Sequence, residues 1–285
     1  MKKLRQLIND KSKPLVVPGV YDAIGAKIAE KVGFEAMFQT GYGTSATLLG
    51  MPDYGFIGLS ETTDNARRIA NAVKVPLIVD VDTGYGNALT VKKLIKDLES
   101  AGASGIFLED QKWPKRCGHM KGKEVVQKEE YAEKLAAAVD SRYNKDFVIV
   151  ARTDARAIEG IDDAIERGKY YKKIGADLIF VEAPKSVEEM KKIGKSINAP
   201  LVANMIEGGA TPISSAKILH KMGYQLILYP LSILYANTFA TLKILKELKN
   251  KSTTLGLKKE LVNFDQFNDI VELSKYRKLE NKYSK

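Results

Sequence analysis

The sequence predicts an α/β protein folded as a (β/α)8 barrel, and three observations support that fold class. Short apolar runs rich in β-branched residues alternate with amphipathic segments along the whole 285-residue chain. Strand–helix units of this kind occur eight times, and eight parallel strands joined by right-handed crossovers close naturally into a barrel. The runs are apolar throughout, as expected for strands that are covered on both faces. A doubly wound open sheet is the alternative arrangement for the same pattern.

The predicted strands and helices follow one another in strict alternation. The strands are expected at residues 15–20, 36–40, 77–83, 105–110, 147–153, 178–183, 201–205 and 225–230. The helices are expected near residues 22–32, 61–73, 90–101, 128–143, 162–174, 186–196, 214–222 and 232–248. Gly33, Gly102 and Gly175 directly follow three of these helices, where a left-handed residue commonly ends a helix.

The chain contains no linker or low-complexity tract that would divide it. We therefore expect one catalytic barrel domain at residues 1–248, followed by a C-terminal helical extension at residues 249–285. Within the last barrel helix, Leu234, Thr238, Thr241 and Leu245 fall at helical spacing and form a largely apolar stripe.

Composition narrows the class of protein. The single Cys excludes an intramolecular disulfide framework and a Cys-rich metal site. No segment approaches the roughly 20 apolar residues of a membrane span, and the N-terminus lacks the apolar core of a secretory signal. We expect a cytoplasmic protein without a membrane partner.

The net charge of +10 raises the question of nucleic acid binding. Residues 242–285 hold eleven Lys and Arg against six Asp and Glu, so half of the excess lies in this tail. Elsewhere the positive residues are interspersed with acids, and over the whole chain Lys outnumbers Arg four to one. We expect a solvated Lys-rich surface and no nucleic acid partner.

Acidic residues dominate the predicted strand ends, which in a barrel carry the catalytic groups. Asp80 and Asp82 end the third strand two residues apart, so their side chains should face the same way, and Glu109 ends the fourth. Like charges this close need a cation between them. Mg²⁺ suits such a site because it keeps water ligands and needs only one or two direct carboxylates. The alternative is that Asp82 or Thr83 caps the following helix.

Further candidate site residues stand at the remaining strand ends. This set comprises Thr40, Gly41, Arg152, Glu182, Asn204, Tyr229 and Pro230.

The loop after the fourth strand is the most informative segment. It contains the only Trp, Trp113, the only Cys, Cys117, and one of two His, His119. Because Lys115 and Arg116 precede Cys117, we expect a cationic setting that favours the thiolate and allows proton exchange near neutral pH. A long polar loop at this place is a candidate lid.

The block Lys-Arg-Cys-Gly-His at residues 115–119 resembles the signature of the isocitrate lyase/phosphoenolpyruvate mutase superfamily. The resemblance covers nearly the whole chain and includes residues 40–43, 50–53, 79–84, 109–111, 151–155, 181–183 and 203–205. It implies a Mg²⁺-dependent barrel (Mn²⁺ as a substitute) whose last helix is exchanged between subunits of a dimer, commonly within a tetramer. The C-terminal extension would then pack on a neighbouring subunit.

The resemblance also implies roles for individual residues. Asp80 would bind the metal directly, while Asp82, Asp53 and Glu109 would act largely through metal-bound water. The catalytic set would be Cys117, Arg152, Glu182 and His119. The substrate, a small carboxylic acid, would be bound by Thr40, Gly41, Tyr42, Lys115, Arg116, Gly118, Asn204, Phe180, Leu228 and Pro230, with the backbone amides of residues 40–42 holding the α-keto-acid end.

Cys117 indicates the reaction. Lyases of the superfamily use this thiol to protonate a carbanion after carbon–carbon cleavage, whereas the phosphonate-forming mutases usually lack it. We therefore expect a lyase that releases pyruvate or another 2-oxo acid from a 2-hydroxy polycarboxylate. Phe180 and Leu228 resemble the apolar pair of methylisocitrate lyases, so cleavage of 2-methylisocitrate to pyruvate and succinate is the first expectation.

The alternatives are a 2,3-dimethylmalate lyase, an oxaloacetate hydrolase-like enzyme and a carboxyphosphonoenolpyruvate phosphonomutase. Ile206, where methylisocitrate lyases have Thr, favours the branch of dimethylmalate lyase and petal death protein. Pro230, where oxaloacetate hydrolases have Ser, disfavours hydrolysis. Phe38 replaces a Tyr often proposed to handle the hydroxyl proton, so Tyr42 or Glu182 would have to replace it.

Overall fold

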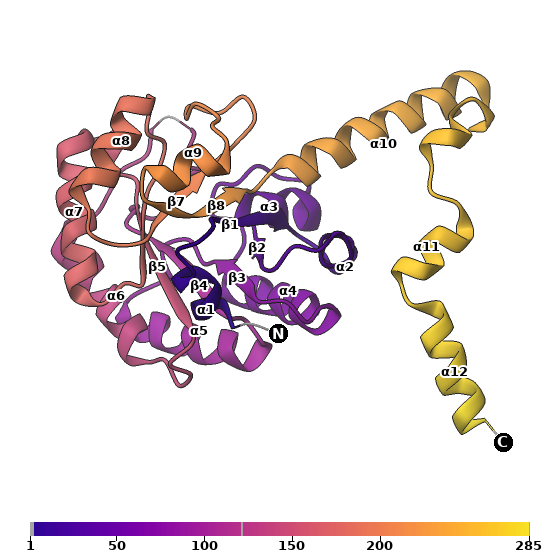
Figure 1. The fold of residues 1–285 in the computed structure, drawn as a ribbon, viewed down its shortest axis with the longest axis horizontal. Coiled ribbons are helices and arrows are strands. Elements are labelled where there is room, and N and C mark those ends of the chain that lie inside the picture. The colour runs from indigo at the N-terminus through magenta and orange to yellow at the C-terminus, as the bar shows by residue number, and fades with distance from the viewer. Residues whose placement is uncertain (1–2, 121, 285) are drawn as a thin grey trace.

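The computed structural model describes residues 3–120 and 122–284, and its eight parallel strands form a closed barrel in sequence order (Figure 1). The strands are β1 (Leu15–Val20), β2 (Met37–Gln39), β3 (Leu77–Asp80), β4 (Gly105–Glu109), β5 (Val148–Thr153), β6 (Leu178–Val181), β7 (Leu201–Asn204) and β8 (Tyr224–Tyr229). Strand β8 closes the barrel on β1, with Leu15 opposite Leu226. The predicted barrel is confirmed, and the open-sheet alternative is wrong.

Helices surround the strands as predicted. They are α2 (Ala23–Val32), α4 (Leu59–Ala72), α5 (Ala88–Ala101), α6 (Lys128–Asp140), α7 (Ile161–Ile174), α8 (Val187–Ser196), α9 (Ala216–Lys221) and α10 (Ser232–Lys251), with a 3-10 turn η1 (Ala155–Ala157). Gly33, Gly102 and Gly175 have φ values of 105°, 93° and 122° at the ends of α2, α5 and α7. These glycines end their helices as predicted.

Two short helices were not predicted. Helix α1 (Leu4–Asn9) places Leu4, Leu7 and Ile8 among the side chains of the barrel interior. Helix α3 (Gly41–Leu49) follows β2 directly, and Thr40 caps it by accepting a hydrogen bond from the Gly43 backbone N–H at 3.4 Å. Both helices are shorter than the length at which periodicity alone is informative.

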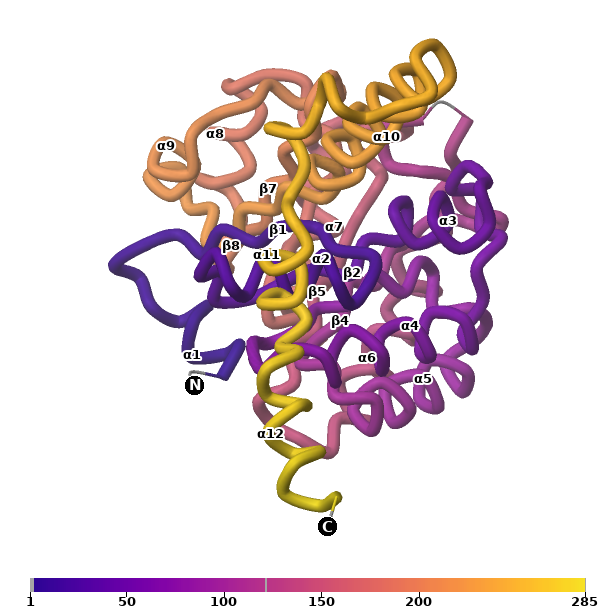
Figure 2. The backbone as a smooth tube through the Cα atoms, turned by 90° about the vertical axis from the view of Figure 1, so that its right-hand side faces the viewer, coloured from indigo at the N-terminus to yellow at the C-terminus, as the bar shows by residue number. Residues whose placement is uncertain are grey.

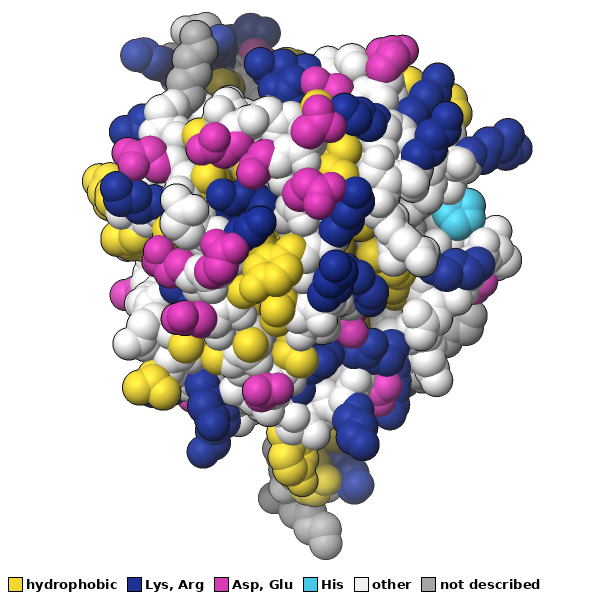
Figure 3. All heavy atoms as spheres, turned by 90° about the vertical axis from the view of Figure 1, so that its left-hand side faces the viewer, with side chains coloured by type: hydrophobic (Ala, Val, Ile, Leu, Met, Phe, Trp, Pro, Cys, Tyr) yellow, Lys and Arg dark blue, Asp and Glu magenta, His cyan; other side chains and the backbone are white. Residues whose placement is uncertain are grey.

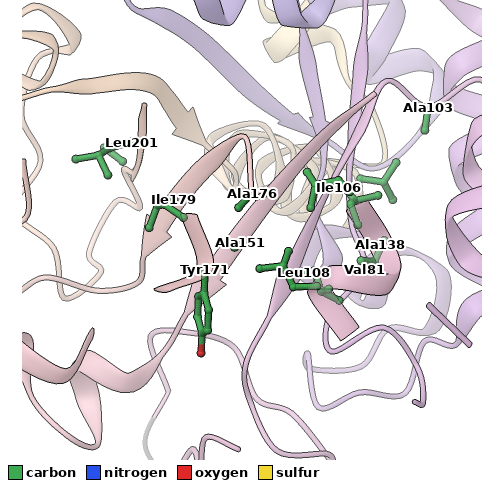
Figure 4. Close-up of a cluster of buried hydrophobic side chains, with 14 of the residues drawn as sticks. Val81, Ala103, Ile106, Leu108, Ala138, Ala151, Tyr171, Ala176, Ile179 and Leu201 are labelled. Atoms are coloured by element: carbon green, nitrogen blue, oxygen red, sulfur yellow. The ribbon is translucent and has the colours of Figure 1, made fainter. Parts of the chain in front are cut away.

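The apolar core has two layers. Inward-facing residues of alternate strands, such as Phe38, Phe107 and Phe180, fill the barrel. A larger cluster lies between the strands and the outer helices, and Figure 4 shows part of it, including Ile106 and Ile179. Because both faces of each strand are buried, the strand ends are fixed rigidly at the mouth of the barrel.

The C-terminal segment projects from the barrel. Helix α10 extends away from it, and η2 (Leu255–Glu260), α11 (Phe264–Ile270) and α12 (Leu273–Tyr283) then turn back along its side (Figures 1 and 2). Helix α11 packs against α2, and Lys27 of α2 forms an ion pair with Glu272 at 2.6 Å. No residue of α10 is buried within the chain.

The surface carries mixed charge. On the face shown in Figure 3, Lys and Arg side chains are interspersed with Asp and Glu. No helix in the described part of the chain has the length and apolar character needed to cross a membrane.

Candidate active site

A pocket opens at the carboxyl ends of the strands and collects most of the predicted site residues. Its predicted lining residues are Thr40, Tyr42, Asp53, Asp80, Lys115, Arg116, Cys117, Gly118, His119, Arg152, Phe180, Glu182, Asn204, Leu228 and Pro230. Gly41, Asp82 and Glu109 do not line it but contact its lining residues directly. Phe38, Phe107, Ile206 and Leu231 complete the wall.

The carboxylates of Asp53, Asp80, Asp82 and Glu109, here called the carboxylate cluster, gather at one side of this pocket. Asp80 ends β3, and its carboxylate accepts backbone N–H hydrogen bonds from Gly41 and from Asp82, each at 3.3 Å. The Gly41 amide is therefore engaged by Asp80 in this structure, and its predicted role as a substrate-binding amide stays a prediction. A Cβ on Gly41 would lie 2.9 Å from Asp80 Oδ2, so glycine is needed for this close approach.

Asp82 reaches the carboxylate cluster differently from the prediction. The strand ends at Asp80, and Asp82 adopts the left-handed region with φ of 49°. Helix α5 is capped by Asn87, so the alternative that Asp82 or Thr83 caps it is wrong. Burial raises the pKa of Asp82 to about 7, with Lys115 opposing the rise and Asp80 adding to it. Burial likewise raises the pKa of Glu109.

Lys115 lies within the carboxylate cluster. Its Nζ is 2.5 Å from Asp53 Oδ1 and 2.6 Å from Asp82 Oδ1, and the residue is only 3% exposed. Burial alone would lower the pKa of Lys115, but the surrounding carboxylates outweigh burial and raise it. The ammonium group is thus paired with carboxylates, a partner set that its predicted role in substrate binding did not include.

The carboxylate cluster has the donors that Mg²⁺ prefers. Glu109 Oε1 is buried and has no hydrogen-bond partner among the described residues. Within residues 3–120 and 122–284, no three acidic, His or Cys side chains lie close enough to enclose a metal without help. This arrangement fits an ion that keeps water ligands and takes only one or two carboxylates directly.

Arg152 connects the carboxylate cluster with the opposite wall. It is the penultimate residue of β5, and its Nη1 lies 3.2 Å from Glu109 Oε2. Its Nε and Nη2 donate to the two oxygens of Asp154 at 2.8 and 3.1 Å. The guanidinium lies 5.5 Å from the centre of the Phe180 ring. Arg152 is therefore held on several sides before any substrate binds.

Glu182 is the centre of a second polar group. His119 Nε2 lies 2.9 Å from Glu182 Oε1, and Asn204 Nδ2 donates to both carboxylate oxygens at 3.4 Å. His119 Nδ1 accepts the Ala210 backbone N–H at 2.9 Å, which places the imidazole proton on Nε2, facing Glu182. Burial opposes ionisation of Glu182, but Arg152 and His119 outweigh burial and lower its pKa.

The loop after β4, residues 111–120 and 122–125, is called the Cys loop here. Its base is closed by backbone pairing of Gln111 with Val125 and of Lys112 with Glu124. The Gln111 side chain accepts the Arg116 N–H at 3.0 Å and donates to its carbonyl at 2.8 Å. These bonds give the loop a defined shape over the pocket.

The Cys loop also contacts residues 53–55, which the sequence did not predict. Lys115 pairs with Asp53, and the Arg116 guanidinium lies 5.8 Å from the centre of the Tyr54 ring. A Cβ on Gly55 would lie 2.8 Å from the Trp113 ring. These contacts join segments about 60 residues apart, and no local pattern could have revealed them.

The environment of Cys117 contradicts the predicted thiolate. Burial raises the pKa of Cys117 to about 11. A hydrogen bond from the His119 backbone and the charge of Arg152 oppose the rise, and the nearby Asp53 and Glu182 add to it. Lys115 is neutralised by carboxylates and Arg116 lies over Tyr54, so the neighbouring cations in sequence do not stabilise a thiolate. The Cys117 thiol therefore keeps its proton at neutral pH.

Residues 4–249 match the family model described as phosphoenolpyruvate phosphomutase. Over 282 residues the chain is 46% identical to 2,3-dimethylmalate lyase of Eubacterium barkeri, covering 99% of this chain and 97% of that protein. It is 40% identical to a 2-methylisocitrate lyase of Aeropyrum pernix, with 99% and 90% covered.

Two further similarities bear on function. The chain is 47% identical to the chloroplastic carboxyvinyl-carboxyphosphonate phosphorylmutase of Arabidopsis thaliana, covering 95% of this chain and 81% of that protein. A crystal structure of 2,3-dimethylmalate lyase, described as a PEP mutase/isocitrate lyase superfamily member, matches with a TM-score of 0.93. That match is 32% identical and covers 100% of this chain and 96% of the other.

Proposed function

The chain belongs to the PEP mutase/isocitrate lyase superfamily, and from that premise we propose that it is a divalent-metal-dependent carbon–carbon lyase. It would release pyruvate, or another 2-oxo acid, from a small 2-hydroxy carboxylic acid. The observation that carries this proposal is that the Cys117 thiol, whose pKa is raised by burial, lines the same pocket as Asp80 and Arg152. An acid on one side and a carboxylate cluster on the other are what cleavage next to an oxygenated carbon requires.

The carboxylate cluster would hold Mg²⁺ or Mn²⁺, with Asp80 as the direct ligand and Asp82, Asp53 and Glu109 acting through water. When bound, the ion would stabilise negative charge on the oxygens of the 2-oxo product. Arg152 would bind an oxygen of the substrate, since its guanidinium lines the pocket and is held in place by Glu109 and Asp154.

Cys117 would donate a proton to the carbon that departs. As the carbon–carbon bond breaks, its electron pair stays on that carbon, which takes the proton from Sγ. The high pKa of the Cys117 thiol ensures that the proton is present before the reaction.

Glu182 is the better of the two candidates for accepting the hydroxyl proton. Its carboxylate is ionised because Arg152 and His119 lower its pKa. Burial raises the pKa of Tyr42, so its phenol stays protonated and is a donor at neutral pH. We assign Glu182 as the base and Tyr42 to hydrogen bonding with the substrate.

For the substrate, we place 2,3-dimethylmalate ahead of 2-methylisocitrate. The departing product would be propionate in the first case and succinate in the second, which differ by one carboxylate. Ile206, Leu228 and Leu231 make part of the pocket wall apolar. Lys115 and Arg152 are already paired with acidic side chains, so a second carboxylate on the departing half would compete with those side chains for a counter-charge.

A phosphonomutase is the second candidate, favoured by the 47% identity to the plant phosphorylmutase. Cys117 argues for the lyase, because a phosphoryl shift needs no proton donor to carbon at this position.

The test is a product screen of the purified protein with Mg²⁺. Pyruvate formed from 2,3-dimethylmalate and 2-methylisocitrate is measured by coupling to lactate dehydrogenase. Oxalate and acetate formed from oxaloacetate are measured by chromatography, and carboxyphosphonoenolpyruvate is followed by ³¹P NMR. We expect pyruvate from 2,3-dimethylmalate at the highest kcat/KM. Higher kcat/KM with 2-methylisocitrate would reverse the order of substrates, and a phosphonate product without pyruvate would reject the lyase.

A further inference from the structure

Lys123 is a buried cation that the proposed mechanism leaves unused. It belongs to the Cys loop, and its side chain is only 2% exposed. Burying an ammonium group is costly unless it is paired and hydrogen-bonded. The partners of Lys123 therefore show what its burial achieves.

Those partners join two parts of the site. Lys123 Nζ donates a short hydrogen bond to the Gly118 carbonyl, five residues earlier in the Cys loop. It also donates to Asp154 Oδ1 at 2.7 Å, directly after the end of β5. One ammonium group thus connects the segment next to Cys117 with the barrel.

Asp154 is a rigid anchor for this connection. It is fully buried and receives two hydrogen bonds from Arg152, at 2.8 and 3.1 Å. Its backbone N–H donates to Asp110 Oδ1 at 2.9 Å, and Asp110 accepts the Tyr171 hydroxyl at 2.8 Å. Lys123 therefore binds the same carboxylate that orients Arg152.

Gly118 lies directly against Arg152 and Glu182. A Cβ added to it would be 2.5 Å from Arg152 Nη2 and 2.6 Å from Glu182 Cδ. The loop position that Lys123 holds is consequently the one in which Cys117 and Arg152 face the same pocket.

We propose that Lys123 is a positioning residue, whose ammonium group holds the Cys loop on the barrel and thereby places Cys117 and Arg152 together. The docking of the Cys loop by Lys123 is a property of the unliganded protein and needs no substrate. Only the effect of this docking on turnover rests on the proposed lyase function.

The first test measures alkylation of Cys117 by iodoacetamide, without metal or substrate. Because Cys117 is the only Cys, total label reports this site alone. Lys123→Met should raise the alkylation rate by about 10- to 100-fold, the effect of losing charge-assisted hydrogen bonds that hold the loop. Removing a nearby cation by itself disfavours the thiolate, so a faster rate reports opening of the loop, both through greater access and through relief of the burial that raises the pKa of Cys117.

Lys112→Met is the matched control. Lys112 lies in the same loop, but it is 62% exposed in its side chain and pairs with Glu124 at the surface. Its substitution should leave the alkylation rate within about twofold of wild type, since exposed ion pairs contribute little.

A second measurement separates local opening from general instability. Alkylation through local opening is nearly independent of low urea concentrations, whereas alkylation through global unfolding rises steeply with urea. Lys123→Gln is studied in parallel, because its amide can still donate to both acceptors and is expected to fall between Lys123→Met and wild type. If both variants alkylate at the wild-type rate, or only through global unfolding, the proposal is overturned.

Turnover provides an independent readout. If the lyase proposal holds, Lys123→Met should lower kcat by at least about tenfold with a smaller change in KM, because substrate still binds while the acid is misplaced. Equal kcat in Lys123→Met and Lys112→Met would overturn the catalytic consequence. A protein that cleaves none of the acids, yet shows faster alkylation in Lys123→Met, would reject the proposed function and retain the positioning role.

Discussion

At the scale of single residues, desolvation decides what Cys117 can do. A thiol that follows Lys115 and Arg116 in the sequence would be acidified if those cations surrounded it in space. Both side chains instead contact other partners, and burial raises the pKa of Cys117 to about 11. A thiol with this pKa is a poor nucleophile, but it stays protonated and can act as a general acid.

Cys117→Ser tests that role directly. The hydroxyl keeps the size and hydrogen bonding of the thiol but is a far weaker acid, so kcat should fall by about 10²–10⁴-fold. Binding of Mg²⁺ and pyruvate, measured by calorimetry, should stay nearly unchanged. Retention of more than about a tenth of wild-type kcat would exclude Cys117 as the proton donor and move the mutase ahead of the lyase.

The pH dependence of Cys117 alkylation tests its pKa. Iodoacetamide reacts with the thiolate, so the rate should keep rising with pH until about 11, where burial places the pKa. A model thiol such as N-acetylcysteine, treated in parallel, should reach its plateau near pH 8.5–9. A plateau for the protein at or below that of the model thiol would contradict the effect of burial.

Asp80 provides the corresponding test for the metal. EDTA should abolish turnover, and Mg²⁺ or Mn²⁺ should restore it. Asp80→Asn should weaken Mg²⁺ binding in calorimetry by tenfold or more, since about one carboxylate charge at a hard cation is lost. Its circular dichroism should match wild type because Asp80 lies at the barrel mouth. Full turnover in the presence of chelator would remove the metal from the mechanism.

At the scale of elements, the Cys loop acts as one body that several contacts hold on the barrel. Lys115 reaches the carboxylate cluster, His119 reaches Glu182, and Lys123 reaches Asp154. These attachments surround Cys117 in the sequence, which explains how a residue in a loop can occupy a defined place in the pocket.

Gly118→Ala should prevent this docking. The added methyl would overlap Arg152 Nη2 and Glu182, two side chains that are themselves held by ion pairs, so the loop has to move. Displacement of about 1 Å at a reacting group can cost 10²-fold in rate, and we expect a loss of that order in kcat. Lys112→Ala in the same loop is the control and should stay close to wild type. Equal activity of Gly118→Ala and wild type would show that the docked loop is not the active one.

At the scale of the whole molecule, the C-terminal segment of a single chain leaves large apolar side chains exposed. Helix α10 carries Phe239, Leu242, Leu245 and Leu248 with exposures of 41–71%. Apolar patches of this kind mark interfaces in soluble proteins. We propose that a second copy covers α10 and that the extension, residues 249–285, packs on that neighbouring subunit in addition to its contact with α2 of its own barrel.

Light scattering tests this assembly. The wild type should have the mass of a dimer or tetramer at micromolar concentration. A Leu242→Asp/Leu245→Asp variant should shift to the monomer, because two charges would be buried in the interface without partners. Lys251→Asp, an exposed position on the opposite face of the same helix, is the control. A monomeric wild type would contradict the proposed assembly.

The barrel itself could be read from the sequence because its determinants are local and repeated. Strands buried on both faces need continuous apolar runs, and the amphipathic helices between them leave no other simple topology. Helix α3 was not predicted because its nine residues include two Gly, three Thr or Ser and no apolar stripe at helical spacing. Only the N-terminal cap at Thr40 marks this helix in the sequence.

Much of the site could also be located in advance. Parallel strands end on the same side of a barrel, so Asp80, Glu109, Arg152, Glu182 and Asn204 had to meet at its mouth. Residue type and order along the chain suffice for that conclusion, and the superfamily signature at residues 115–119 adds the chemistry.

Only the tertiary structure decided how these groups influence one another. The partners of Lys115 and Lys123 lie 62 and 31 residues away in the chain, at Asp53 and Asp154. The pKa of Cys117 follows from burial under the folded loop and not from its neighbours in sequence. The physical reason is that secondary structure follows from local pattern, whereas desolvation and charge pairing depend on distances that exist only once the barrel has closed.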